Sequence, residues 1–141
     1  MATSIVVVDS SVIVKWLNQT NEQNVAQADI LLGHAQNKSL GLAAPELAKF
    51  EVGNALTYKH LSTPELVEAI SLLYSFPLTF VSWNITLAAL TAELAATYQI
   101  TYYDASFICL AEHLHAPLIT DNPKHQKKVK GVTVTALKDY R

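Results

Sequence analysis

The segment Ser4–Val8 constrains the fold of this chain more than any other feature. It reads Ser-Ile-Val-Val-Val and leads directly into Asp9. Valine and isoleucine favour extended backbone, and a run that is apolar at every position is typical of a strand buried on both faces of a parallel sheet. The run therefore predicts a central strand of an α/β protein, with a carboxylate at its carboxyl end.

The rest of the chain alternates between short apolar runs and helical patterns. Further strands are expected over residues 40–43, 78–81, 118–120 and 132–134. Helices are expected over residues 10–17, 21–37, 45–60, 66–74, 86–98 and 103–115. Strands that alternate with helices form parallel βαβ units. The pattern predicts an α/β fold with helices on both sides of a parallel sheet, in which sites form at the carboxyl ends of the strands.

Composition narrows the class of protein. The chain has 141 residues, of which 50% are hydrophobic and 16% are charged, and its sequence contains no repeat, low-complexity tract or flexible linker. These values are typical of one globular domain, which we assign to residues 1–141. The single cysteine excludes an internal disulfide framework and favours a reducing compartment. No apolar run is long enough for a membrane span and the signal-peptide pattern is missing, so we expect a soluble, cytoplasmic protein.

Two aspartates directly follow predicted strands. Asp9 comes after the first strand, and Asp121 comes after the strand predicted at residues 118–120. Both are therefore expected at the edge of the sheet where the carboxyl ends of parallel strands meet. Each has a structural alternative: Asp9 is a suitable helix N-cap, and Asp121 is an ordinary turn residue in Asp-Asn-Pro.

Two glutamates in the predicted helix 45–60 point in different directions. A rotation of about 100° per residue places Glu51 on an apolar face and Glu46 on the opposite one. The apolar face consists of Leu47, Phe50, Ala55 and Tyr58, and the opposite face contains Lys49, Gly53 and His60. Glu51 is therefore expected to point inward, with Asn54 about one turn away to hydrogen-bond or orient it. A buried glutamate held by a lysine or by backbone donors is the alternative.

The same rotation per residue places the side chains of the predicted helix 103–115. Asp104 lies on its apolar arc, close to Phe107, Ile108 and Ala111. The alternative is purely structural, because a carboxylate at the start of a helix interacts favourably with the helix dipole. A fourth acid can thus face the same cleft as the two strand-end aspartates and the inward glutamate.

The four acids, Asp9, Glu51, Asp104 and Asp121, require a counter-charge if they converge. The sequence places no strong basic partner near any of them. Mg²⁺ or Mn²⁺ fits, because these ions take carboxylate oxygens and keep waters for substrate phosphates. Clustered carboxylates with one or two such ions are suited to phosphodiester hydrolysis by a metal-activated water.

Other α/β classes fit the same residues less well. A dinucleotide-binding domain needs a glycine-rich turn after the first strand, and Asp9-Ser10-Ser11 has no glycine. A response-regulator domain needs a pair of acids near the first strand, whereas Glu51 lies in the middle of a helix. A phosphatase of the haloacid-dehalogenase type needs a second aspartate two residues after the first, where this chain has Ser11.

Four segments resemble the PIN-domain ribonucleases, and among them the VapC-type toxins of toxin–antitoxin pairs. They are IVVVDSSVIVKW at residues 5–16, PELAKFEVGNAL at 45–56, YDAS at 103–106 and LITD at 118–121. These segments occur in the order and at spacings similar to those of the family, and they cover nearly the whole chain.

The resemblance implies an α/β/α sandwich around a parallel sheet and Mg²⁺- or Mn²⁺-dependent endonuclease activity on RNA. It also implies a cognate antitoxin that blocks the site, and a homodimer. Asp9, Glu51 and Asp104 would be the acidic metal-site residues, and Ser11 and Thr120 would be hydroxyls near the site.

The fourth motif departs from the family pattern. The family usually has one residue between the threonine and the acid, whereas Thr120 is followed directly by Asp121, which leaves Asn122 at the usual acidic position. Either Asp121 reaches the metal through a shifted backbone, or Asn122 is a neutral ligand. A catalytically weakened domain that only binds RNA or a protein partner is therefore the alternative function.

Basic residues follow the fourth motif closely. The net charge of the chain is −2, so no overall basic field attracts a nucleic acid. Lys124, Lys127 and Lys128 are candidates to contact RNA phosphates beside the metal site, and Lys15 is a further candidate. A solvated surface loop is the alternative for the cluster.

Overall fold

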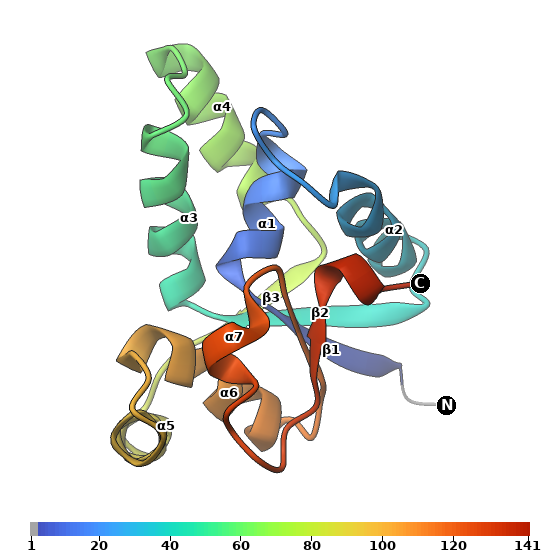
Figure 1. Ribbon diagram of the computed structural model, residues 1–141. Helices are drawn as coiled ribbons and strands as arrows, with labels where there is room; N and C mark the ends of the chain where they lie inside the picture. Colours follow the sequence, from blue (N-terminus) through green and yellow to red (C-terminus); the bar gives the residue numbers. More distant parts are fainter. Residues whose placement is uncertain (1–2) are drawn as a thin grey trace.

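A five-stranded parallel sheet forms the centre of the computed structural model, which describes residues 3–141 (Figure 1). Its strands are β1 (Ser4–Val8), β2 (Leu40–Pro45), β3 (Leu78–Val81), β4 (Leu118–Thr120) and β5 (Val134–Ala136). They are arranged in the order β3-β2-β1-β4-β5, and every neighbouring pair is parallel. The predicted central position of the first strand is confirmed.

The strand order reverses at β1: the chain adds β2 and β3 on one side of this strand and then β4 and β5 on the other. Residue Val7 of β1 is paired with Ala43 of β2 on one side and with Leu118 of β4 on the other. Val7 and Val8 are fully buried, as expected for a strand covered on both faces. In an open α/β sheet a crevice forms where the strand order reverses, outside the carboxyl ends of the strands. In this chain the order reverses between β1 and β4, so a site is expected beyond the carboxyl ends of these two strands.

Helices cover both faces of the sheet. One side carries α1 (Ser10–Leu17), α2 (Val25–Gln36), α3 (Leu47–Thr57) and α4 (Thr63–Leu73), whereas α5 (Ile85–Tyr98) and α6 (Tyr102–His113) lie on the other (Figure 1). A short helix, α7 (Pro123–Gln126), follows β4, and a 3-10 turn over Leu137–Asp139 ends the fold. The predicted three-layer α/β/α sandwich is confirmed.

Side-chain caps define where several helices begin. The Asp9 carboxylate caps α1 by accepting a hydrogen bond from the Ser11 amide. Ser62 and Glu65 form a reciprocal capping box at the start of α4. Each cap satisfies an amide that has no partner within its own helix. The N-cap of α1 is thus Asp9, the structural role that the sequence analysis gave as the alternative for this residue.

Several predicted boundaries are wrong for local reasons. Helix α3 begins at Leu47 because Pro45 is still part of β2, and the next amide, that of Glu46, donates to the Val81 carbonyl of β3. Helix α2 begins at Val25 because Asn24 adopts the left-handed conformation, with φ of 56°. Strand β5 begins at Val134, two residues later than expected, and α7 replaces part of the predicted loop.

Among residues 3–141, no helix combines the length and the apolar character that are required to cross a bilayer.

Candidate metal centre

Asp9 lies at the carboxyl end of the central strand, at the crevice between β1 and β4. Its Oδ2 atom accepts hydrogen bonds from Ser11 Oγ at 2.6 Å and from Thr120 Oγ1 at 3.2 Å, in addition to the Ser11 amide at 3.3 Å. All the hydrogen bonds that the described residues make to this carboxylate reach Oδ2. The other oxygen, Oδ1, therefore remains available to ligate a cation. Ser11 and Thr120 both contact Asp9 through their hydroxyl groups.

Glu51 comes from α3 and is half-buried. Ser10 Oγ donates a hydrogen bond to Glu51 Oε1 at 2.9 Å. Burial raises the pKa of Glu51 above its usual value, and the negative charges of Asp9 and Asp104 raise it further, although the hydrogen bond from Ser10 opposes the shift. The three carboxylates are thus close enough to repel one another.

The apolar face predicted for the α3 helix is wrong, although its glutamate does face the crevice. Phe50 and Tyr58 are each 73% exposed, whereas the buried side chains are Ala48, Val52 and Leu56. These three residues recur at intervals of four and form a narrow stripe, which packs the helix against α1. Glu51 lies at the border of this stripe.

Asp104 enters from the opposite helical layer, in the first turn of α6. The hydroxyl of Thr101 caps this helix and accepts a hydrogen bond from the Asp104 amide at 3.0 Å. Burial raises the pKa of the Asp104 carboxyl, and the charge of Asp9 adds to the shift, while the nearby His125 of α7 opposes it. Asp104 therefore shares the electrostatic environment of the other two acids.

The arrangement fits a hard divalent cation by the chemistry of its donors. Within residues 3–141, no Lys or Arg forms an ion pair with Asp9, Glu51 or Asp104. Carboxylates that are half-buried, mutually repelling and unpaired are costly without a counter-charge. In the same described part of the chain, no three His, Cys, Asp or Glu side chains form a ready-made cage for an ion. The three acids therefore suit Mg²⁺ or Mn²⁺ held partly through water, as is usual for Mg²⁺.

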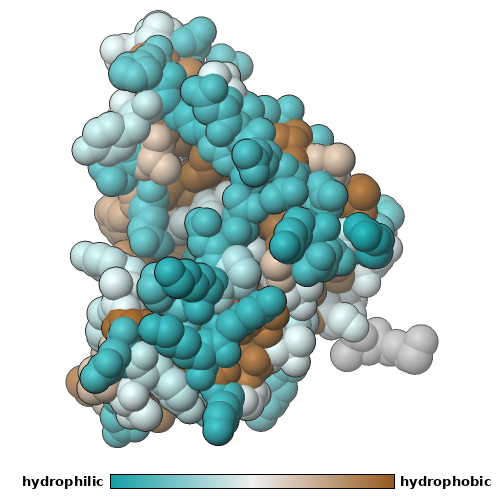
Figure 2. Space-filling view, in the orientation of Figure 1, coloured by the Kyte–Doolittle hydropathy of each residue, from teal (hydrophilic) through white to brown (hydrophobic). Residues whose placement is uncertain are grey.

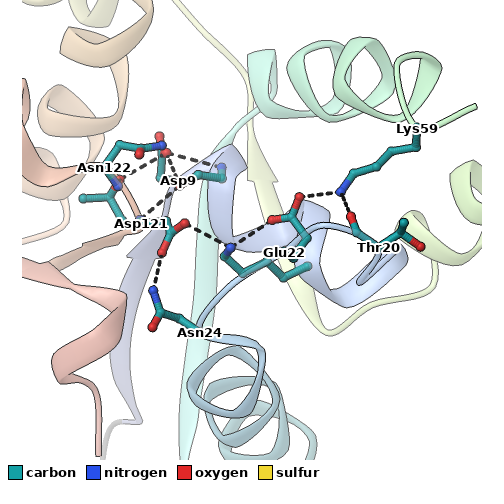
Figure 3. Close-up of polar contacts among 10 residues, drawn as sticks. Asp9, Thr20, Glu22, Asn24, Lys59, Asp121 and Asn122 are labelled. Carbon is teal, nitrogen blue, oxygen red and sulfur yellow. Dashed lines mark hydrogen bonds and ion pairs between the residues drawn. The ribbon is translucent and has the colours of Figure 1, made fainter.

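Asp121, the fourth expected acid, faces a different partner. Its Oδ2 atom lies 3.0 Å from Lys15 Nζ, and its Oδ1 atom accepts a hydrogen bond from Asn24 at 3.0 Å (Figure 3). The expectation that no basic residue lies near these acids is wrong for Asp121. The Lys15 side chain is 2% exposed, so the expected RNA contact by Lys15 is also wrong. Asn122 is exposed, and its amide donates to Thr120 Oγ1 at 3.1 Å.

The other expected residues are placed as follows. Asn54 is exposed, and the hydrogen bond to Glu51 among the described side chains comes from Ser10 and not from Asn54. Lys124, Lys127 and Lys128 are all exposed, on α7 or directly after it. Figure 2 shows hydrophilic side chains gathered over this part of the surface. His125, in the same segment, lies near enough to Asp104 for its charge to oppose the rise in the pKa of that carboxyl.

Sequence reasoning missed several residues that shape the site. Ser10 was not among the expected site residues, although its hydroxyl donates a hydrogen bond to Glu51. His125 was not among them either, although its charge opposes the rise in the pKa of Asp104. Glu22 and Asn24 carried no signal, because the segment before α2 was expected to be helical and its contacts depend on the fold. A serine directly after a strand-end aspartate is the one clue that a motif search can use.

The sequence matches the profile described as the PIN domain over residues 6–131. This chain belongs to the PIN domain family. The resemblance drawn from its four motifs is therefore confirmed at the level of the family. No curated protein sequence matches this chain.

Solved structures that share the fold of this PIN domain include toxin–antitoxin proteins. VapBC2 from Rickettsia felis, bound to a promoter DNA fragment, has a TM-score of 0.72 at 15% identity, covering 94% of this chain and 98% of that one. DNA-bound VapBC from Salmonella typhimurium has a TM-score of 0.71 at 12% identity, covering 96% of this chain and 99% of that one. VapC20 from Mycobacterium tuberculosis is described as a toxin that cleaves the sarcin–ricin loop. It has a TM-score of 0.67 at 11% identity, covering 86% of this chain and 93% of that one. At these identities the likeness is one of fold.

Proposed function

We propose that this PIN domain is a Mg²⁺- or Mn²⁺-dependent endoribonuclease and the toxin of a type II toxin–antitoxin pair. The observation that carries the proposal is the convergence of Asp9, Glu51 and Asp104 from β1, α3 and α6 without an ion-pairing Lys or Arg among residues 3–141. A divalent cation held there supplies positive charge to a phosphate and a water nucleophile for hydrolysis.

The chain's own residues have distinct tasks in this proposal. Ser11 and Thr120 fix one oxygen of Asp9 and leave the other free, and Ser10 fixes one oxygen of Glu51. Lys124, Lys127 and Lys128 contact backbone phosphates and hold the RNA strand along the crevice. Such contacts position a nucleic acid without reading its sequence. They also offset the repulsion expected from a chain of net charge −2.

The toxin role draws on the proteins that share the fold. The structures from Rickettsia felis and Salmonella typhimurium are VapBC proteins bound to DNA, and VapC20 is described as a toxin that cleaves the sarcin–ricin loop. For this chain we propose an RNA substrate, a cognate antitoxin that covers the crevice, and assembly as a homodimer. We place it in the cytoplasm, in keeping with its single free cysteine, Cys109, which is buried.

Cleavage of RNA by the purified chain tests this proposal. A mixture of structured RNAs is incubated with the protein in the presence of Mn²⁺, Mg²⁺ or EDTA. The proposal predicts discrete products with either cation and none with EDTA. Asp104→Asn keeps the volume of the side chain and removes its charge, so cleavage should fall by about 100-fold or more, as for the loss of a group that stabilises transition-state charge.

The same assay decides between the nuclease and the weakened binding domain. RNA that is bound but not cut with either cation would favour the binding module. Metal-dependent cutting that persists in Asp104→Asn would instead point to a contaminating nuclease or to a different site. Glu46→Gln is the matched control, because Glu46 pairs with Lys49 and Ser82 and not with the three acids.

A further inference from the structure

Lys15 is a buried lysine in α1, a helix whose other buried side chains after Ser10 are all apolar. It lies in α1 between Val14 and Trp16, both of which belong to the hydrophobic core. Its ammonium group is 2.9 Å from Glu22 Oε1 and 3.0 Å from Asp121 Oδ2. A lysine this deeply buried is costly unless it is paired, and here it bridges two carboxylates.

The bridge continues in both directions from Lys15. Glu22 also pairs with Lys59, two residues after the end of α3, and Asn24 donates a hydrogen bond to the second oxygen of Asp121 (Figure 3). Burial alone would lower the pKa of Lys15, but the hydrogen bonds and charges of Glu22 and Asp121 outweigh it and raise the pKa above its usual value. Lys15 therefore keeps its charge.

A second chain of contacts leads from Asp121 to the candidate metal centre. The Asp121 amide donates to Ser11 Oγ at 3.1 Å, and Ser11 Oγ donates to Asp9 Oδ2 at 2.6 Å. The hydroxyl of the residue before, Thr120, donates to the same Asp9 oxygen. The turn after β4 thus orients Asp9 through its backbone and its hydroxyl groups, and this turn is held in place by the carboxylate that Lys15 binds.

We propose that Lys15 is a positioning residue for Asp9, and that Asp121 serves the site as the partner of Lys15 and not as a metal ligand. The proposal rests on the proposed function only in taking Asp9 to be a metal ligand. It gives a reason for the departure in the fourth motif, because the acid next to Thr120 is used to anchor the turn.

The two roles of Asp121 predict opposite effects when Lys15 is removed. If Asp121 is a metal ligand, the lysine competes with the cation for its oxygens, and Lys15→Met should tighten Mn²⁺ binding. If Asp121 is an anchor, Lys15→Met releases the turn and disorders Asp9, so binding should weaken. The loss of a positive charge near the site would by itself favour a cation. A weaker affinity in this variant is therefore a clear sign of positioning.

The first test is a calorimetric titration of the folded protein with Mn²⁺ alone. The dissociation constant should rise by about 10- to 100-fold in Lys15→Met, the range found when outer-shell partners of metal ligands are removed. Lys49→Met is the matched control, since it breaks another Lys–Glu pair, at 3.3 Å, that does not reach Asp9. Its dissociation constant should stay within about twofold of the wild type. Unchanged or tighter binding in Lys15→Met overturns the proposal.

The double variant Lys15→Met/Asp121→Asn tests whether the two residues act as a unit. The single variant Asp121→Asn should weaken Mn²⁺ binding to a similar extent. The double variant should bind Mn²⁺ no more weakly than either single variant. Such non-additivity is expected for residues that work through one contact. Effects that multiply in the double variant would contradict the anchor role.

Amide hydrogen exchange in the metal-free protein provides a readout that is independent of metal and RNA. In Lys15→Met, the amides of Asp121 and Asn122 should exchange at least about tenfold faster, because the turn opens locally more often. Unchanged exchange there overturns the proposal even if Mn²⁺ binding falls. A wild-type protein that binds no Mn²⁺ would contradict the proposed function, and the exchange rates would still decide the role of Lys15.

Discussion

Asp9, Glu51 and Asp104 repel one another when no cation lies between them. Burial raises the pKa of Glu51 and of Asp104, and the charge of Asp9 adds to both shifts. A carboxyl whose pKa is raised in the folded state lowers the stability of that state whenever it is ionised. The metal-free protein therefore carries a local cost at its candidate site, as functional sites often do.

Removing one of these charges should stabilise the metal-free protein. In EDTA near pH 8, we expect Asp104→Asn to unfold about 1–3 °C above the wild type, which is the scale of a sub-kcal/mol change in a domain of this size. The cost of ionising the Asp104 carboxyl in the folded state is present at high pH and is lost as pH falls through its raised pKa, so this difference should shrink as pH is lowered. Thermal unfolding over a series of pH values checks this, and a variant that is less stable at pH 8 would contradict it.

The same pKa shifts predict how cation binding depends on pH. Protons compete with a metal for ionised carboxylates. Because the pKa values of Glu51 and Asp104 are raised, this competition should begin at a higher pH than for ordinary carboxyls. As pH falls through the raised values, we expect the Mn²⁺ affinity to drop by about tenfold per pH unit for each proton displaced. A Mn²⁺ dissociation constant that does not change until pH reaches the usual range of carboxyl pKa values would contradict the raised pKa values of Glu51 and Asp104.

Residues differ in how far the sequence predicts their roles. Asp9 and Asp104 could be found because one follows a buried strand and the other opens a helix. Asp121 follows a strand in the same way, yet its partner Lys15 lies on α1, and no local pattern pairs two residues so far apart in the chain. The contact depends on β1 and β4 being neighbours, which is a property of the assembled sheet.

At the scale of elements, helix α3 shows why a helical wheel is not sufficient. The large apolar residues Phe50 and Tyr58 suggested the buried face, but the stripe of Ala48, Val52 and Leu56 packs against α1 instead. Small and branched side chains allow two helices to approach closely, whereas bulky aromatic ones do not. A helical wheel shows where apolar residues lie around a helix, but it does not include the shape of the neighbouring helix.

Glu46 tests the orientation of α3 toward the crevice. It lies at the N-cap of this helix, where its oxygens contact Lys49 at 3.3 Å and Ser82 at 3.2 Å. Exposed ion pairs of this kind contribute little to stability. We therefore expect Glu46→Gln to keep RNA cleavage and Mn²⁺ affinity within about twofold of the wild type. A large loss of either would mean that α3 turns a different face to the site.

At the scale of the whole molecule, the order β3-β2-β1-β4-β5 creates the site. The fold class could be predicted because buried strands alternate with helices along the chain. The strand order could not be read from that alternation, although it decides which strand ends share the crevice. It also brings Glu51 of α3 and Asp104 of α6, from opposite helical layers, close to Asp9 at the end of the central strand.

The surface of the single chain bears on its assembly. Large apolar side chains remain exposed, including Phe50 at 73% and Ile85 at 83%. Exposed apolar patches on a globular protein often mark interaction surfaces. For the proposed homodimer, light scattering should give about twice the mass of one chain, and Phe50→Glu should weaken association by about tenfold or more, as for a buried interface residue. A monomer at every concentration would contradict the dimer.

A Mn²⁺ titration of the metal-free wild type, Asp104→Asn and Glu46→Gln tests the metal centre most directly. We expect saturable binding to the wild type, binding of equal strength to Glu46→Gln, and at least about tenfold weaker binding to Asp104→Asn, because a ligand carboxylate has lost its charge. Wild-type affinity in Asp104→Asn, or no binding to any of the three proteins, would contradict a metal centre built by Asp9, Glu51 and Asp104.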